Sequence, residues 1–129
     1  MICRDIYEGA LACLGEDPSG EHSEDYAARS PYLLAALCFL LGETDRCYRA
    51  ERGLEAQKSL PDRKIELSAA FPLCKEFAPA AVYYLASMLI FDTDSDRSDT
   101  LFEKYYMAAK SVIGTIVFES KKIIDKYPL

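Results

Sequence analysis

The feature that most constrains the fold is an uninterrupted apolar stretch at residues 78–91, APAAVYYLASMLIF. Its only polar groups are the hydroxyls of Tyr83, Tyr84 and Ser87. A helix that is apolar on every side has no face for solvent, so other elements must surround it. The stretch is also too short to cross a bilayer, which takes about 20 apolar residues. We therefore predict that it forms the central helix of a small bundle.

Length and charge limit the kinds of protein that this chain can be. It has 129 residues, which fits one domain with a core that needs neither metals nor disulfides. The formal net charge is −6, whereas binding to nucleic-acid phosphates needs clustered Lys and Arg. The two most basic segments, residues 46–52 and 121–126, are both mixed with acids and favour solvated helix faces. We expect no sequence-specific nucleic-acid binding.

The cysteines indicate a reducing compartment. There are five of them, an odd number without C-x-x-C spacing: Cys3, Cys13, Cys38, Cys47 and Cys74. Such a set predicts free thiols rather than a disulfide framework. At the N-terminus, Arg4 and Asp5 are followed by an amphipathic pattern, with no signal peptide visible. We therefore expect a cytoplasmic protein.

The first half of the chain has the start and stop signals of helices. Residues 2–15 are amphipathic at helical spacing, and Gly15 is a plausible end. Within residues 25–42, Ser30 and Pro31 are typical of a helix start, with 25–29 as a preceding turn or bent extension, and Gly42 is typical of an end. Thr44 then caps a short polar helix that ends near residue 53. The prolines of residues 54–72 favour a loop across the bundle, in which residues 64–68, KIELS, are either one short strand or an extended segment.

The last helix is predicted to be long. From Thr100 onward one apolar stripe repeats at helical spacing: Leu101, Tyr105, Ala108, Val112, Ile116 and Ile123. A helix of roughly 25 to 30 residues would be about 40 Å long, more than the rest of the bundle needs. The predicted fold class is therefore all-α: a small helical bundle of three long helices plus one short, with an extended loop at about 54–72 and a long C-terminal helix.

An acidic turn before this helix is the sharpest motif for chemistry. Its oxygen-bearing residues follow the spacing of positions 1, 3, 5, 7, 9 and 12 of an EF-hand calcium loop: Asp92, Asp94, Asp96, Ser98, Thr100 and Glu103. However, Arg97 stands where such loops have glycine, and Asp99 where they have an apolar residue. We favour a plain turn, in which Asp94, Ser95 or Asp96 caps the last helix. Calcium binding by Asp92, Asp94, Asp96 and Glu103 is the alternative.

No other pattern indicates catalysis. His22, the only histidine, lies in a polar loop without a nucleophile motif nearby, and neither a zinc site nor a di-metal carboxylate site has its usual ligand spacing. No phosphate-binding glycine loop or hydrolase elbow is present in the sequence. The tyrosine pairs at 83–84 and 105–106 suit a core and its rim. We expect no catalytic residues, no cofactor and no enzyme activity.

A family resemblance takes the interpretation further. Residues 71–112, FPLCKEFAPAAVYYLASMLIFDTDSDRSDTLFEKYYMAAKSV, resemble small proteins encoded beside capsid and portal genes in tailed phages and prophages of Gram-positive bacteria. The shared pattern is an FPL…F…A…YYLA helix, an acidic turn and an SD.LF..Y helix. The segments CRDIYEGALACLGE and DYAARSPYLLAAL near the N-terminus fit the same picture. These proteins are similar to head–tail connector, or adaptor, subunits.

The resemblance implies a function in assembly. Connector subunits are small α-helical proteins whose copies form a ring under the portal and join the packaged head to the tail. The expected partners are the portal protein and copies of this chain, with no membrane, in a virion or the bacterial cytoplasm. The residues expected to make these contacts are apolar and lie near the end of the last helix: Phe118, Ile123, Ile124, Tyr127 and Leu129. The alternative function is a calcium-responsive helical binding module that uses the acidic turn 92–103.

Overall fold

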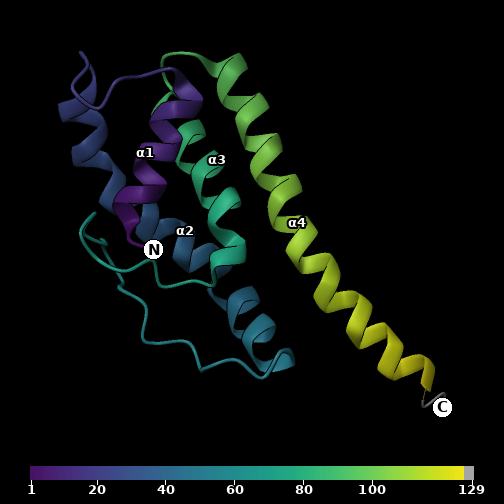
Figure 1. The fold of residues 1–129 in the computed structure, drawn as a ribbon. Coiled ribbons are helices and arrows are strands. Elements are labelled where there is room, and N and C mark those ends of the chain that lie inside the picture. Colours follow the sequence, from purple (N-terminus) through teal and green to yellow (C-terminus); the bar gives the residue numbers. More distant parts are fainter. Residues whose placement is uncertain (127–129) are drawn as a thin grey trace.

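The computed structural model confirms an all-α bundle (Figure 1). It describes the backbone of residues 1–126 and the side chains of residues 1–116. The elements are α1 (Cys3–Leu14), α2 (Ser23–Glu51), a 3-10 turn (Lys75–Phe77), α3 (Ala78–Leu89) and α4 (Ser95–Lys126). Over the described backbone the chain has no strand, only one isolated antiparallel bridge between Ile2 and Ala70.

Residues 78–89 of the apolar stretch form the central helix, as predicted, whereas Ile90 and Phe91 follow its end and Phe91 is exposed. α3 lies between α1 and α4 and contacts all three other helices (Figure 1). Leu85, Ala86 and Leu89 are completely buried, as is Phe77 just before the helix. Pro79 falls in the first turn, where its missing N–H interrupts no hydrogen bond.

α1 packs closely on α3 because Gly9 has no side chain. A Cβ at Gly9 would lie 3.1 Å from Cγ2 of Val82, which is tighter than ordinary van der Waals contact. α1 ends as predicted at Gly15, whose φ of 69° is a left-handed conformation that glycine adopts without strain.

The predicted division of residues 25–53 into two helices is wrong. α2 is one helix of 29 residues that starts at Ser23 and continues past both Pro31 and Gly42. The Ser30 hydroxyl does not cap a start but donates to the Tyr26 carbonyl within the helix, at 2.7 Å. Figure 1 shows that α2 is bent, as expected for a helix with an interior proline.

Gly42 serves packing rather than termination. A Cβ at this position would lie 2.8 Å from Cδ1 of Leu60, a residue of the loop that crosses the helix. The Gln57 side-chain amide of the same loop donates to the Gly42 carbonyl at 2.8 Å. Gly42 has a lower helix propensity than alanine by about 1 kcal/mol. This cost is offset by contacts that form only because the loop approaches the helix closely at this glycine.

The loop at 54–72 lies across the bundle, as expected. The KIELS segment is neither a strand nor extended throughout, because residues 67–68 form a turn in which the Ala69 N–H donates to the Glu66 carbonyl at 2.9 Å. Its alternation reflects burial, because Ile65 and Leu67 are in the core whereas Lys64, Glu66 and Ser68 are exposed. The Ala69 and Leu67 carbonyls accept hydrogen bonds from the N–H groups of Cys3 and Arg4, both at 2.8 Å. The loop thus satisfies N–H groups that the first turn of α1 leaves without partners.

α4 is longer than predicted and extends past the other helices. It begins at Ser95 rather than near Thr100, and its 32 residues span about 48 Å. The stripe that faces the bundle ends, over the described side chains, with Val112 and Ile116, which are partly buried against the core. Figure 1 shows the yellow end of α4 running beyond the lower end of α3, away from the other helices.

Candidate functional site

An exposed apolar surface of α2 borders a groove. Four side chains of α2 lie at helical spacing on one face and are exposed: Tyr32, Ala36, Phe39 and Leu40. Phe39 is 85% exposed, more than any other large apolar side chain described. Together with Ala35, with Leu60 to Arg63 of the loop and with Tyr84 of α3, they line a groove of about 620 Å³. We call this the α2 groove.

The α2 groove lies over closely packed core residues. On the opposite face of α2, Leu34, Leu37 and Cys38 are completely buried. Tyr84 is nearly buried and packs edge-on against Tyr105 of α4, with ring centroids 5.2 Å apart. Such a surface offers apolar contact and aromatic edges, with Asp62 and Arg63 as its charged members. An exposed apolar surface with aromatic side chains has the composition of a binding surface.

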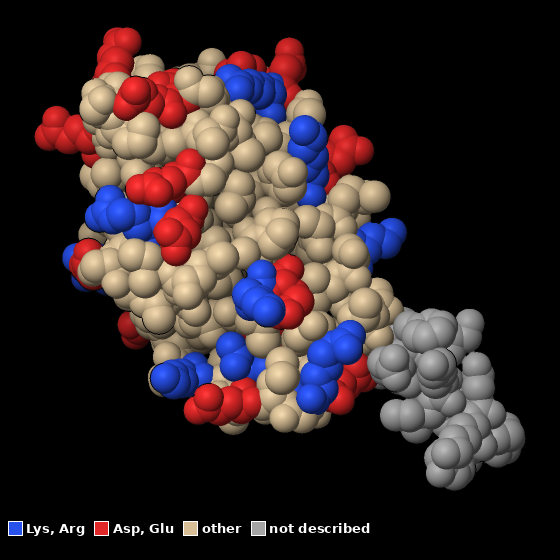
Figure 2. Space-filling view, viewed as in Figure 1, with Lys and Arg blue, Asp and Glu red and all other residues tan. Residues whose placement is uncertain are grey.

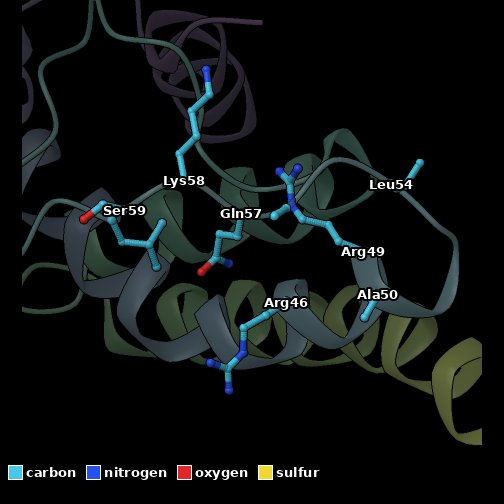
Figure 3. Close-up of a pocket in the computed structure, with 9 residues that line it drawn as sticks. Arg46, Arg49, Ala50, Leu54, Gln57, Lys58 and Ser59 are labelled. Atoms are coloured by element: carbon cyan, nitrogen blue, oxygen red, sulfur yellow. The ribbon is translucent and has the colours of Figure 1, made fainter.

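A second candidate lies between the C-terminal half of α2 and the start of the loop. Residues of both segments line a pocket of about 550 Å³ (Figure 3). Among them are Arg46, Arg49, Gln57 and Lys58. Arg46 and Lys58 point in opposite directions in Figure 3, and Arg46 is paired with Glu43. Their charges therefore do not converge on one point, as an anion site requires.

Two residues that line this pocket, Arg49 and Gln57, bind the buried carboxylate of Asp45. Its Oδ1 accepts a hydrogen bond from the Cys74 N–H at 2.7 Å. Its Oδ2 accepts from Arg49 Nε at 2.8 Å and from Gln57 Nε2 at 2.7 Å. Arg49 also donates to the carbonyls of Glu55 and Pro72. These bonds fasten both ends of the loop to α2, and we call them the Asp45 clasp.

The clasp keeps Asp45 ionised. Burial alone raises the pKa of this carboxyl, but the hydrogen bonds from Cys74, Gln57 and Arg49 outweigh burial and bring the pKa below its usual value. Among the described residues, no buried side-chain nitrogen or oxygen lacks a hydrogen-bond partner. A carboxylate whose lone pairs are already in use is a structural group rather than a catalytic base.

The acidic turn caps α4. Asp94 Oδ1 accepts a hydrogen bond from the Arg97 N–H at 3.1 Å, so Asp94 is the capping residue among the three considered. Ser98, Thr100 and Glu103 all belong to the continuous helix and do not wrap around a common point. Among the described side chains, no three His, Cys, Asp or Glu residues lie close enough together to hold a metal. The calcium hypothesis stays a prediction without support from this geometry.

Ser98 connects α4 to α3, which differs from the role of calcium ligand considered for it from the sequence. Its hydroxyl donates to the Ser87 carbonyl at 2.9 Å, and the Ser87 hydroxyl donates to the Ser98 carbonyl at 2.8 Å. Both residues are buried where α3 and α4 meet. These reciprocal bonds join the start of α4 to the centre of the bundle.

The remaining candidates lie apart from one another. His22 is exposed just before α2 and stacks on Tyr26 with ring centroids 5.4 Å apart. All five cysteines are free thiols, and Cys3, Cys38 and Cys74 are buried. Burial raises the pKa of these three thiols to about 11, 12 and 11 respectively. Such thiols are poor nucleophiles at neutral pH.

The contact residues predicted from the sequence lie outside the described side chains. Phe118, Ile123 and Ile124 fall on the last turns of α4, for which only the backbone is described, and Tyr127 and Leu129 follow the described backbone. Their assignment as partner contacts stays a prediction.

Charge is mixed over the surface. On the face seen in Figure 2, acidic and basic side chains alternate around wide uncharged areas, and neither sign forms a continuous patch. None of the described helices is long and apolar enough to cross a membrane. The site that the sequence did not predict is the α2 groove, because residues 32–41 are apolar on all sides and do not reveal which of them face outward.

Comparison with known proteins adds no relative. No protein-family model, curated protein or solved structure matches the chain.

Proposed function

We propose that this chain is a phage or prophage structural protein of the head–tail connector kind, which assembles with copies of itself on a portal. Its work is then done by surfaces that bind other subunits. The observation that carries the proposal is the α2 groove, where Phe39 is 85% exposed although it sits on a helix with a fully buried opposite face. Exposed apolar surface of this kind marks interaction sites in otherwise well-packed proteins.

Two further features support an assembly function. α4 has 32 residues and its end runs beyond the lower end of α3 (Figure 1), whereas Ile116 is the last described side chain that packs against the core. The resemblance of residues 71–112 to connector subunits covers α3, the acidic turn and the first half of α4. These elements support the α2 groove and the second half of α4. A ring needs two different faces on each subunit, one for each neighbour.

Co-purification with a portal tests this proposal. The chain is co-expressed with the portal protein of the genome that encodes it, and the complex is isolated through a tag on the portal and imaged by electron microscopy. We expect a ring of this chain on one end of the portal. A portal that purifies without the chain, at concentrations at which both are folded, would contradict the proposed function.

A further inference from the structure

The α2 groove and the end of α4 are matched in length and chemistry. The groove's exposed α2 residues extend from Tyr32 to Leu40, a span of about 12 Å along the helix. From Ile116, the last described residue that packs on the core, α4 continues for ten residues to Lys126, about 15 Å. The sequence from 117 onward contributes six apolar residues: Val117, Phe118, Ile123, Ile124, Tyr127 and Leu129. We call residues 117–129 the α4 tail.

The helical part of the tail, residues 117–126, extends away from the groove of the same chain (Figure 1). Tyr105 of α4 packs against Tyr84, which lines the groove. α4 is unbroken from Ser95 to Lys126, so residues 117–126 lie about 18 to 32 Å farther along the helix axis than Tyr105. Residues 117–126 that occupy the groove would therefore belong to another copy.

Charge is compatible with the same pairing. The tail contains three lysines, Lys121, Lys122 and Lys126, against Glu119 and Asp125, in a chain whose formal net charge is −6. A slightly basic segment is attracted to an acidic neighbour, whereas two acidic bodies repel each other. The charge of the tail therefore does not oppose its approach to a second copy.

From these observations we propose that the α2 groove of each subunit receives the α4 tail of a neighbouring copy. This inference rests on the proposed function and specifies the contact between ring subunits. The contact is heterologous, because the tail and the groove are different surfaces. When one such contact joins two copies, one groove and one tail of the pair remain unpaired. Repetition of one such contact produces a closed ring or an open filament, depending on the rotation between subunits.

Mixing two full-length variants tests the contact. Phe39→Asp places a charge in the groove and leaves the tail intact, whereas Ile123→Asp with Ile124→Asp alters the tail and leaves the groove intact. Each variant alone should associate at least about tenfold more weakly than the wild type, measured as mass by sedimentation. Mixed together, they should form a 1:1 dimer and nothing larger, because one intact tail meets one intact groove.

Controls separate this contact from other causes. Phe91→Asp makes the same change at another exposed residue, 64% exposed and outside the groove, and should leave the wild-type association unchanged. Circular dichroism and the melting temperature verify that each variant is folded. A wild-type chain that stays monomeric up to millimolar concentration, or a mixture that stays monomeric, overturns the inference. Binding to the portal, measured separately, decides the proposed function, so the two can fail independently.

Discussion

At the scale of single residues, buried polar groups explain why the loop at 54–72 keeps its place. Asp45 is completely buried, yet it is ionised because three donors surround it. Its role was not predictable from the sequence, because the surrounding polar stretch, DRCYRAERG, is typical of a solvent-exposed helix face. Only the fold brings Gln57 and the Cys74 N–H to the same carboxylate.

We predict that Asp45→Asn destabilises the chain strongly. If the amide NH₂ replaced Oδ2, it would face two donors, Arg49 Nε and Gln57 Nε2. If it replaced Oδ1, it would face the Cys74 N–H. In both orientations Arg49 would lose the negative charge with which it pairs. The expected loss is about 3 kcal/mol of unfolding free energy, measured by urea denaturation at pH 7. Glu43→Gln is the matched control, because Glu43 pairs with Arg46 on the exposed side of the same helix and its replacement should leave the urea midpoint unchanged.

The same carboxylate predicts a pH dependence. The folded-state pKa of Asp45 lies below its unfolded value, so its stabilisation is fully present above the unfolded pKa of about 3.9 and is lost as the pH falls through the folded pKa. The stability difference between wild type and Asp45→Asn should therefore shrink below about pH 4. A difference that is the same at pH 7 and pH 3 would contradict the account of the clasp.

The cysteines provide a second test at this scale. Because burial raises the pKa of Cys3, Cys38 and Cys74 to about 11 or 12, each has roughly a hundredth or less of the thiolate of an ordinary cysteine at pH 8. Iodoacetamide should alkylate exposed Cys47 first and these three only after unfolding. Mass spectrometry of peptides sampled over time gives the order, and early labelling of Cys38 would contradict the core.

At the scale of elements, the helices α1, α3 and α4 and the end of α1 at Gly15 were predictable from the sequence, whereas the bounds of α2 and the start of α4 were not. The central helix and the amphipathic α1 and α4 follow from apolar patterns, which record burial directly. Ser30 and Pro31 misled the prediction for α2 because the Ser30 hydroxyl donates to the Tyr26 carbonyl one turn earlier instead of capping a helix start. Gly42 misled it because its stop signal is overridden by packing against Leu60 of the loop. Tertiary contacts of this kind leave no mark in local sequence.

The cap of α4 is testable at this scale. Asp94→Ala removes the acceptor for the Arg97 N–H and should cost about 1 kcal/mol, seen as a lower midpoint in urea denaturation. Asp96→Ala removes a nearby acid whose side chain has no hydrogen bond in the structure, so its effect should be clearly smaller. If both changes had equal effects, charge in the acidic turn would matter rather than the cap.

Millimolar calcium should produce no binding heat with the wild type.

At the scale of the whole molecule, the chain consists of a packed bundle and two surfaces that we propose bind other subunits. The bundle is α3 with α1, α2 and the first half of α4 around it, tied by the Asp45 clasp and the Ser87–Ser98 bonds. The surfaces are the α2 groove and the α4 tail. The tail was expected from the length of the last helix, whereas the groove required the fold, since it joins residues from two helices and a loop.

The most direct test of the assembly account is removal of the end of α4. A chain that stops at residue 120 lacks Ile123, Ile124, Tyr127 and Leu129 but keeps every side chain that packs in the described core. We predict an unchanged melting temperature, together with loss of self-association in sedimentation and loss of ring formation on the portal. A truncated chain that assembles like the full-length protein would contradict the claim that α4 extends past its bundle in order to bind another subunit.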